Sequence, residues 1–110
     1  MPSMYVQVDY RKRDQRPRTY ASVKKLSKDC YYVLGHTNGY LCSINVHIRI
    51  CKGVSTGMGK GICGPANALI TILRGMIEDA CKTCKVDPNY CHRLTSEIMD
   101  RVSTVLMKLK

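Results

Sequence analysis

The alternating run "YLCSINVHIRIC", residues 40–51, constrains the fold of this chain most strongly. Apolar side chains occupy every second position between residues 42 and 50, and polar or charged side chains lie between them. Because successive side chains of a strand point to opposite faces of a sheet, this pattern predicts a β-strand with one buried face. A second apolar run, "CYYVLG", precedes it and leads to Asn38-Gly39, a dipeptide that favours a tight turn. Residues 30–50 are therefore expected to contain a β-hairpin.

Two amphipathic helices are expected in the C-terminal half. Apolar side chains recur at spacings of three and four over residues 66–80, and Pro65 is placed to pre-organise the first turn. In the second helix, Asp87 can act as the N-cap and Pro88 suits the first helical position. Its apolar stripe covers residues 94–109. These two segments are expected to pack their apolar sides on the sheet.

The glycine-rich segment between strand and helix satisfies the pattern G-x-G-x-x-G at residues 59–64. A dinucleotide-binding turn also needs a parallel sheet, but too little chain remains to form one and the preceding strand is expected in a hairpin. A Walker loop needs a hydroxyl residue directly after its lysine, where this chain has Gly61. The Gln or Arg that begins an acetyltransferase pyrophosphate loop is also missing. The glycines are best explained by the backbone conformations that the turn before the helix requires.

Charge points to a polyanionic partner. The 110 residues carry 18 Lys and Arg against eight Asp and Glu, a net charge of +10. Eight of the basic residues and two of the acidic ones lie within residues 1–28. Such an excess favours binding to nucleic acid, although a solvated basic surface is the plain alternative. The length predicts a single core, and no apolar run of transmembrane length appears, so no membrane partner is expected.

The seven cysteines are an odd number in a chain without a recognisable secretory signal. This favours reduced thiols or a metal site over a disulfide framework, and hence an intracellular location in nucleus or cytoplasm. The segment "CKTCKVDPNYCH" contains a C-x-x-C pair, a common half of a zinc site. The candidate zinc ligands are Cys81, Cys84, Cys91 and His92, with Cys30, His36 or His47 as other sources of a fourth ligand. Alternatively, Cys81 and Cys91 are small core residues.

The order of the elements resembles the double-stranded-RNA-binding domain over residues 4–80. "YVQVDYRKRDQ" matches that family's first helix, although "YVQVDY" by itself alternates like a strand. Pro17 and Tyr20 match the approach to the first strand, and Gly35-His36-x-x-x-Tyr40 matches the start of the second. The glycines at 53, 57, 59 and 61 match the third strand, and Ala66 matches the alanine of the lysine motif. Where the family has Ser-Lys-Lys, this chain has Ile62-Cys63-Gly64.

The resemblance implies an α+β fold, an α-β-β-β-α sandwich with an additional C-terminal helix. Residues 1–80 would form the RNA-binding domain, and residues 81–110 a cysteine-containing helical extension packed on it. The implied function is binding of double-stranded RNA by an accessory domain such as those at the C-terminus of Dicer and other ribonuclease III proteins. The candidate RNA-binding residues are Gln7, Arg11, Lys12, Lys24, Lys25, Lys28, His36 and Lys60. Gln7 and Arg11 would share one face of the first helix.

Catalysis by this chain is not expected. Glu78 and Asp79 are neighbours on a helix and point in different directions, so they do not form a pair for general acid and base chemistry. Two other functions are compatible with the pattern. The domain could dimerise or dock another protein, with weak nucleic-acid binding, or it could be a small cysteine-rich protein that binds single strands.

Overall fold

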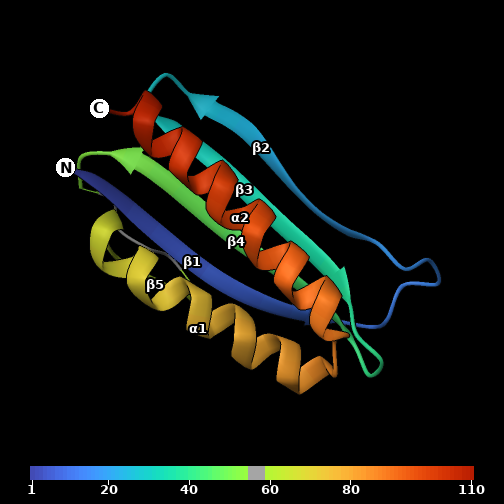
Figure 1. The fold of residues 1–110 in the computed structure, drawn as a ribbon. Coiled ribbons are helices and arrows are strands. Elements are labelled where there is room, and N and C mark those ends of the chain that lie inside the picture. Colours follow the sequence, from blue (N-terminus) through green and yellow to red (C-terminus); the bar gives the residue numbers. More distant parts are fainter. Residues whose placement is uncertain (55–58) are drawn as a thin grey trace.

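The computed structural model describes residues 1–54 and 59–110, which form a five-stranded antiparallel sheet followed by two helices (Figure 1). The elements in chain order are β1 (Pro2–Arg11), β2 (Thr19–Ser27), β3 (Cys30–Asn38), β4 (Ser43–Lys52), β5 (Ile62–Pro65), α1 (Ala66–Cys84) and α2 (Pro88–Lys108). The strand order across the sheet is β2-β3-β4-β1-β5. This strand-first order means that the expected α-β-β-β-α arrangement is wrong.

The N-terminal segment is where that expectation fails first. Residues 2–11 form β1, which pairs with β4 along its whole length and with β5 on its other side. Met4 and Val6 are completely buried, whereas Gln7 and Asp9 are only half-buried. This alternation is the period-two pattern of a strand. The charged residues after residue 10 favour a helix locally, but pairing of β1 with both β4 and β5 stabilises the strand.

The core lies between one face of the sheet and the two helices. The helix-covered face of β4 carries Ile44, Val46, Ile48 and Ile50, all completely buried. Helix α1 packs on β1, β4 and β5, and α2 packs on β2 and β3. Figure 1 shows both helices in front of the sheet, on the same side. The opposite face of the sheet is therefore left without a helical layer.

Both helices confirm the sequence patterns. Asp87 is the N-cap of α2, with its Oδ1 accepting a hydrogen bond from the Asn89 backbone N–H at 2.8 Å, and Pro88 begins the helix. Helix α1 begins directly after Pro65 and ends at Cys84, and the C-cap that follows, Lys85, has left-handed backbone angles (φ 54°). Within the described residues, neither helix is both long and apolar enough to span a bilayer.

The expected hairpin is present as β3 and β4, but its turn differs from a two-residue Asn-Gly turn. Asn38 belongs to β3, and the chain reverses over residues 39–42. Gly39 is required there by close packing, because a Cβ atom would lie 2.1 Å from the carbonyl oxygen of Cys84. The turn is thereby held against the end of α1.

The third strand expected over residues 53–61 is not found at the described residues of that range, 53, 54 and 59–61. The strand in this region, β5, begins only at Ile62, and Gly57 lies outside the described residues. Gly61 lies so close to β1 that a Cβ atom would be 2.4 Å from the carbonyl oxygen of Val6. The resemblance implied that Gly61 belongs to the third strand. In the structure, glycine at this position allows the chain before β5 to pack closely on β1.

Six of the seven cysteines form disulfides. Cys30–Cys51 joins neighbouring positions of β3 and β4, Cys42–Cys84 joins the β3–β4 turn to α1, and Cys81–Cys91 joins the two helices. Small domains with several disulfides are typical of oxidising compartments such as the extracellular space. The expectation of reduced thiols in the nucleus or cytoplasm is therefore wrong. The odd number of cysteines had argued against a disulfide framework, but it reflects only Cys63, which lies outside the three disulfides.

Candidate nucleic-acid interface

The helix-free face of the sheet, here called the open face, carries a polar and aromatic set of side chains. Neither α1 nor α2 lies over it (Figure 1). The strand register determines which side chains belong to this face. A residue that faces away from the core is paired with a residue of the adjacent strand that also faces away from it. The side chains are exposed or half-buried: Gln7, Asp9, Tyr20, Lys24, Tyr32, Leu34, Asn45, His47 and Arg49.

Two tyrosine–histidine pairs lie on the open face. The rings of Tyr32 and His47 are stacked, with centroids 6.0 Å apart, and the Tyr32 hydroxyl is hydrogen-bonded to His47 Nδ1. The rings of Tyr20 and His36 are stacked at 5.3 Å, and the Arg18 guanidinium lies 5.7 Å from the Tyr20 centroid. Burial, followed by the nearby Tyr20 hydroxyl, raises the pKa of Tyr32, so its ring stays neutral at physiological pH.

Tyr5 lies at the β5 side of the same face and is almost fully buried. The Arg49 guanidinium lies 5.3 Å from its ring centroid, and the Gly61 backbone N–H donates to its hydroxyl at 3.0 Å. That hydroxyl in turn donates to Gln7 Oε1 at 3.0 Å. These contacts position Arg49 beside the other aromatic side chains of the open face.

Asp9 is the acidic group of the open face. Arg11 Nε donates to its Oδ2 at 2.9 Å, and His47 Nε2 lies 3.8 Å from the same oxygen. The hydrogen bond from Arg11 holds the pKa of Asp9 below its ordinary value, and the charges of Arg11 and His47 add to this against the effect of burial. Asp9 therefore stays ionised and partly neutralises the basic groups around it.

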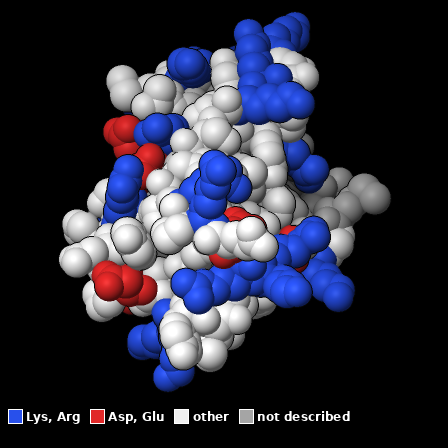
Figure 2. Space-filling model, turned by 90° about the vertical axis from the view of Figure 1, so that its right-hand side faces the viewer, with Lys and Arg blue, Asp and Glu red and all other residues white. Residues whose placement is uncertain are grey.

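The loop between β1 and β2 is strongly basic and is fixed to the sheet. Asn38 accepts from the Asp14 backbone N–H through Oδ1 at 3.1 Å, and its Nδ2 donates to the Arg16 carbonyl at 2.6 Å. The Asp14 carboxylate lies 2.7 Å from His36 Nε2 and 3.7 Å from Arg18. Figure 2 faces this end of the molecule, where Lys and Arg side chains cover far more of the surface than Asp and Glu do.

The residues expected to bind RNA fall into three places. Gln7, Arg11 and Lys24 lie on the open face, although Gln7 and Arg11 share a strand face there and not a helix face. His36 also points to this side but is buried beneath Asp14 and Tyr20. The remaining four are exposed elsewhere: Lys12 in the β1–β2 loop, Lys25 on the helix side of β2, Lys28 at the β2–β3 turn, and Lys60 just before β5.

Several side chains of the open face were missing from the sequence-based set. Tyr32, Arg49 and Tyr5 were not considered, and the only ligand considered for His47 was zinc. The alternation of β4 already placed His47 and Arg49 on the polar side of a strand. What the alternation could not show is that β1 and β3 flank β4 and add their tyrosines to the same face.

The expected zinc site is absent from the described residues. Cys81 is bonded to Cys91 and Cys84 to Cys42, so these thiolates cannot coordinate a metal, and His92 is exposed on α2. Among residues 1–54 and 59–110, no group of three or more His, Cys, Asp or Glu side chains could hold a metal ion. Zinc binding by Cys81, Cys84, Cys91 and His92 is therefore wrong.

Comparisons with protein-family models, with curated proteins and with solved structures find no match to this chain. The functional proposal therefore rests on the chemistry of the open face and the basic loop beside it.

Proposed function

We propose that the open face binds single-stranded nucleic acid, with the basic β1–β2 loop holding the phosphate backbone. The observation that carries the proposal is a sheet whose one face is covered by two helices while the other presents Tyr20, Tyr32, His47 and Arg49. Unpaired bases stack on aromatic side chains of exposed sheets, and such stacking tolerates any sequence because every base has a π-face.

The charge distribution supports the same ligand. Residues 1–65, which include the sheet, contain eleven Lys and Arg but only three Asp, whereas the helical part contains seven Lys and Arg with five Asp and Glu. A basic surface attracts the phosphate backbone regardless of base sequence. Lys24 and Arg49 lie in the same cross-strand row as Tyr32, so a base stacked there would place its phosphates near a cation.

Duplex RNA, expected from the sequence, is the competing ligand. That expectation depended on a helix-first arrangement that the chain does not have. A-form duplex presents its phosphates and 2′-hydroxyls but keeps its bases stacked inside. Paired bases cannot lie on Tyr20 or Tyr32, so the open face favours a single strand.

Fluorescence anisotropy of a labelled uridine 20-mer tests the proposal, with a 20-base-pair RNA duplex and heparin as competitors. Tight binding to the single strand, weaker competition by duplex and heparin, and a steep salt dependence are expected. If heparin competes as well as unlabelled single strand does, binding is explained by charge alone and the open-face proposal is contradicted. Concentration-dependent association of the protein with no nucleic-acid binding would replace the proposal with a protein-interaction module.

Two matched pairs of variants locate the surface. Tyr20→Leu removes an open-face ring and is expected to weaken binding by about 1–3 kcal/mol, whereas Tyr10→Leu removes a tyrosine from the opposite face of the sheet and should have little effect. Lys24→Gln should lower the salt slope by about 0.7 if it removes one phosphate contact, and Lys25→Gln on the helix side should not. Equal effects within either pair would contradict binding on the open face.

A further inference from the structure

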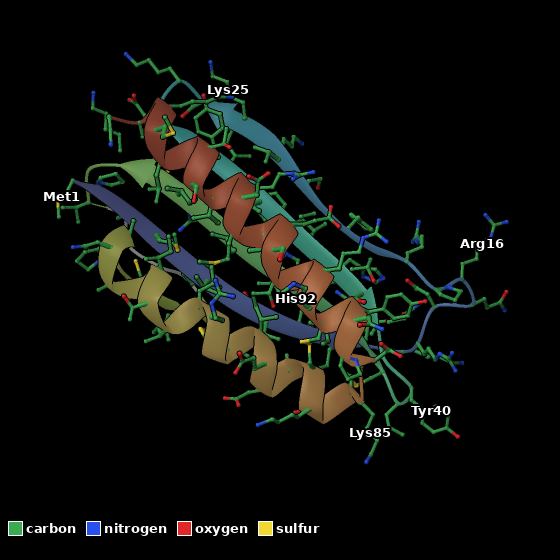
Figure 3. The ribbon with its side chains drawn as sticks, in the orientation of Figure 1. Met1, Arg16, Lys25, Tyr40, Lys85 and His92 are labelled. Carbon is green, nitrogen blue, oxygen red and sulfur yellow. A yellow bond between two sulfur atoms is a disulfide. The ribbon has the colours of Figure 1, made fainter. Side chains whose placement is uncertain are left out.

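A cavity of about 580 Å³ lies where three loops meet at one end of the sheet. Its walls come from the β1–β2 loop, the β3–β4 turn and the turn between α1 and α2, and it is here called the end pocket. Arg13, Tyr40, Lys85, Asp87 and Tyr90 are among its lining residues. Figure 3 shows Arg16, Tyr40 and Lys85 at this same end, with Lys25 at the other end of the molecule.

Two walls of the end pocket are joined covalently and by backbone hydrogen bonds. The Cys42–Cys84 disulfide links the β3–β4 turn to the end of α1. Tyr40 N–H donates to the Lys85 carbonyl at 2.9 Å, and Leu41 N–H donates to the Cys84 carbonyl at 2.9 Å. The third wall is held by the hydrogen bonds of Asn38 to the β1–β2 loop. The end pocket is thus pre-formed, which reduces the entropy lost on binding.

The chemistry of the end pocket suits a ligand with an aromatic ring and a phosphate. Tyr40 is 74% exposed and Tyr90 42% exposed, so both rings are accessible for stacking. Arg13 and Lys85 supply two cations, and guanidinium and ammonium groups are the usual partners of phosphate. Asp87 uses Oδ1 to cap α2, which leaves Oδ2 as an acceptor for a ribose hydroxyl.

Lys85 also has an unusual backbone conformation. It is the described non-glycine residue with a positive φ, 54°, and it ends α1 where glycine is usually found. A lysine in the left-handed region is strained relative to glycine, and such strain is commonly found at functional sites. Glycine would fit this backbone conformation better, so lysine at position 85 places a cation at the end pocket at some cost in backbone strain.

We infer that the end pocket binds a nucleoside monophosphate, with the base against Tyr40 and Tyr90 and the phosphate on Arg13 and Lys85. The monophosphate can be free or can be the phosphorylated 5′ end of a strand, because both present the same groups. This site is distinct from the open face and does not depend on it. Its volume lies within the range of small-ligand pockets.

The test is a titration of the oxidised 110-residue chain with adenosine 5′-monophosphate, followed by ¹H–¹⁵N NMR. Adenosine and inorganic phosphate are titrated in parallel. Shift changes are expected at Tyr40, Lys85 and Tyr90 with the nucleotide, at least tenfold weaker binding of adenosine or phosphate alone, and no comparable change on the open face. A uridine 20-mer with and without a 5′-phosphate distinguishes the two sources, since only the phosphorylated strand should shift the same residues.

Lys85→Gly separates ligand binding from folding. Glycine keeps the left-handed backbone without strain, so the variant should unfold at the same or a higher temperature yet bind the nucleotide at least fivefold more weakly. Lys82→Gln removes the same charge from α1 outside the end pocket and should leave nucleotide binding unchanged. The inference is overturned if millimolar nucleotide causes no shifts, if phosphate alone binds as well, or if both variants weaken binding equally. None of these results bears on binding of the 20-mer to the open face.

Discussion

Gly39 packs directly against the backbone of Cys84: a Cβ atom on Gly39 would lie 2.1 Å from the Cys84 carbonyl oxygen and 2.7 Å from its carbonyl carbon. These two residues are 45 positions apart in the chain, and their contact joins the β3–β4 turn to the end of α1. The adjacent Cys42–Cys84 disulfide fixes the same junction covalently. The order of this end of the molecule, and with it the end pocket, depends on this close backbone approach together with the disulfide and the backbone hydrogen bonds beside it.

Gly39→Ala is predicted to destabilise the fold by more than about 2 kcal/mol, because the obstructing atoms are backbone and cannot move aside cheaply. Gly75→Ala provides the control. Gly75 lies within α1, a Cβ there meets nothing within 4 Å, and alanine should stabilise the helix by about 0.5–1 kcal/mol. Urea denaturation of both variants measures the difference. Opposite signs are expected, and a stable Gly39→Ala variant would show that the junction opens easily.

Removal of individual disulfides is predicted to follow the length of chain that each one closes. The loop-entropy relation gives about 4 kcal/mol for Cys42–Cys84, with a separation of 42 residues, and about 3 kcal/mol for Cys81–Cys91, with a separation of 10. Paired Cys→Ala variants compared by urea denaturation test this order, with Cys63→Ala as the variant that breaks no disulfide. The reverse order would mean that native contacts, and not chain entropy, dominate.

The sequence was sufficient for those elements whose pattern is local. The alternation of Ile44 to Ile50 predicted β4, and Asp87 with Pro88 predicted where α2 begins. Strand β1 was missed even though Met4, Val6 and Val8 alternate with polar residues. The basic run that follows favoured a helix, and only non-local pairing with β4 and β5 decides between the two.

The sites were less predictable because they depend on which strands are neighbours. Gln7, Arg11 and Lys24 were identified from charge and polarity, but the tyrosines beside them belong to strands placed together by the order β2-β3-β4-β1-β5. Cysteine partners are equally non-local: Cys42 and Cys84 are joined only because the β3–β4 turn meets the end of α1. A C-x-x-C spacing within one helix gave no indication that its two thiols face different partners.

Asn38 is predicted to control the order of the β1–β2 loop. Its buried side chain bonds to the Asp14 and Arg16 backbone and to the Ser43 hydroxyl, so Asn38→Ala leaves several groups without partners. We expect a loss of about 2–3 kcal/mol and faster hydrogen exchange in residues 12–18. Asn67→Ala, on the exposed first turn of α1, is the control. Unchanged exchange in the loop would show that the Asp14–His36 contact is enough to hold it.

Removal of the Asp9 charge is predicted to strengthen nucleic-acid binding. Asp9→Asn makes the open face more positive and releases Arg11, so a gain of about twofold to fivefold at low salt is expected. Asp100→Asn on α2 makes the same change in net charge on the helix side and should give a smaller gain. Anisotropy titrations compare them, and equal gains would assign the effect to net charge alone.

The same carboxylate has a defined pH dependence. Since the pKa of Asp9 is lowered in the folded state, its contribution to stability is present above its ordinary value of 3.8 and is lost as the pH falls through the lowered pKa. A ¹³C NMR titration should show the Asp9 carboxyl titrating below 3.8. In Arg11→Gln, which lacks the main stabilising hydrogen bond, the titration should move back toward 3.8. An unchanged titration would assign the lowered pKa to another group.

Tyr32 is predicted to titrate above the ordinary pKa of a tyrosine side chain. Burial raises its pKa above the ordinary value of 10.0, so its contribution to stability is fully present below pH 10 and is lost as the pH rises through the raised pKa. A ¹³C titration of the tyrosine rings, with the Tyr32 signal assigned from the Tyr32→Phe variant, should show Tyr32 titrating above 10.0. Bound single strand should delay the Tyr32 titration further, because a stacked base and its phosphates disfavour the phenolate. If the oligonucleotide changes the NMR signals of the Tyr40 ring but leaves the Tyr32 titration unchanged, the strand lies in the end pocket and not on the open face.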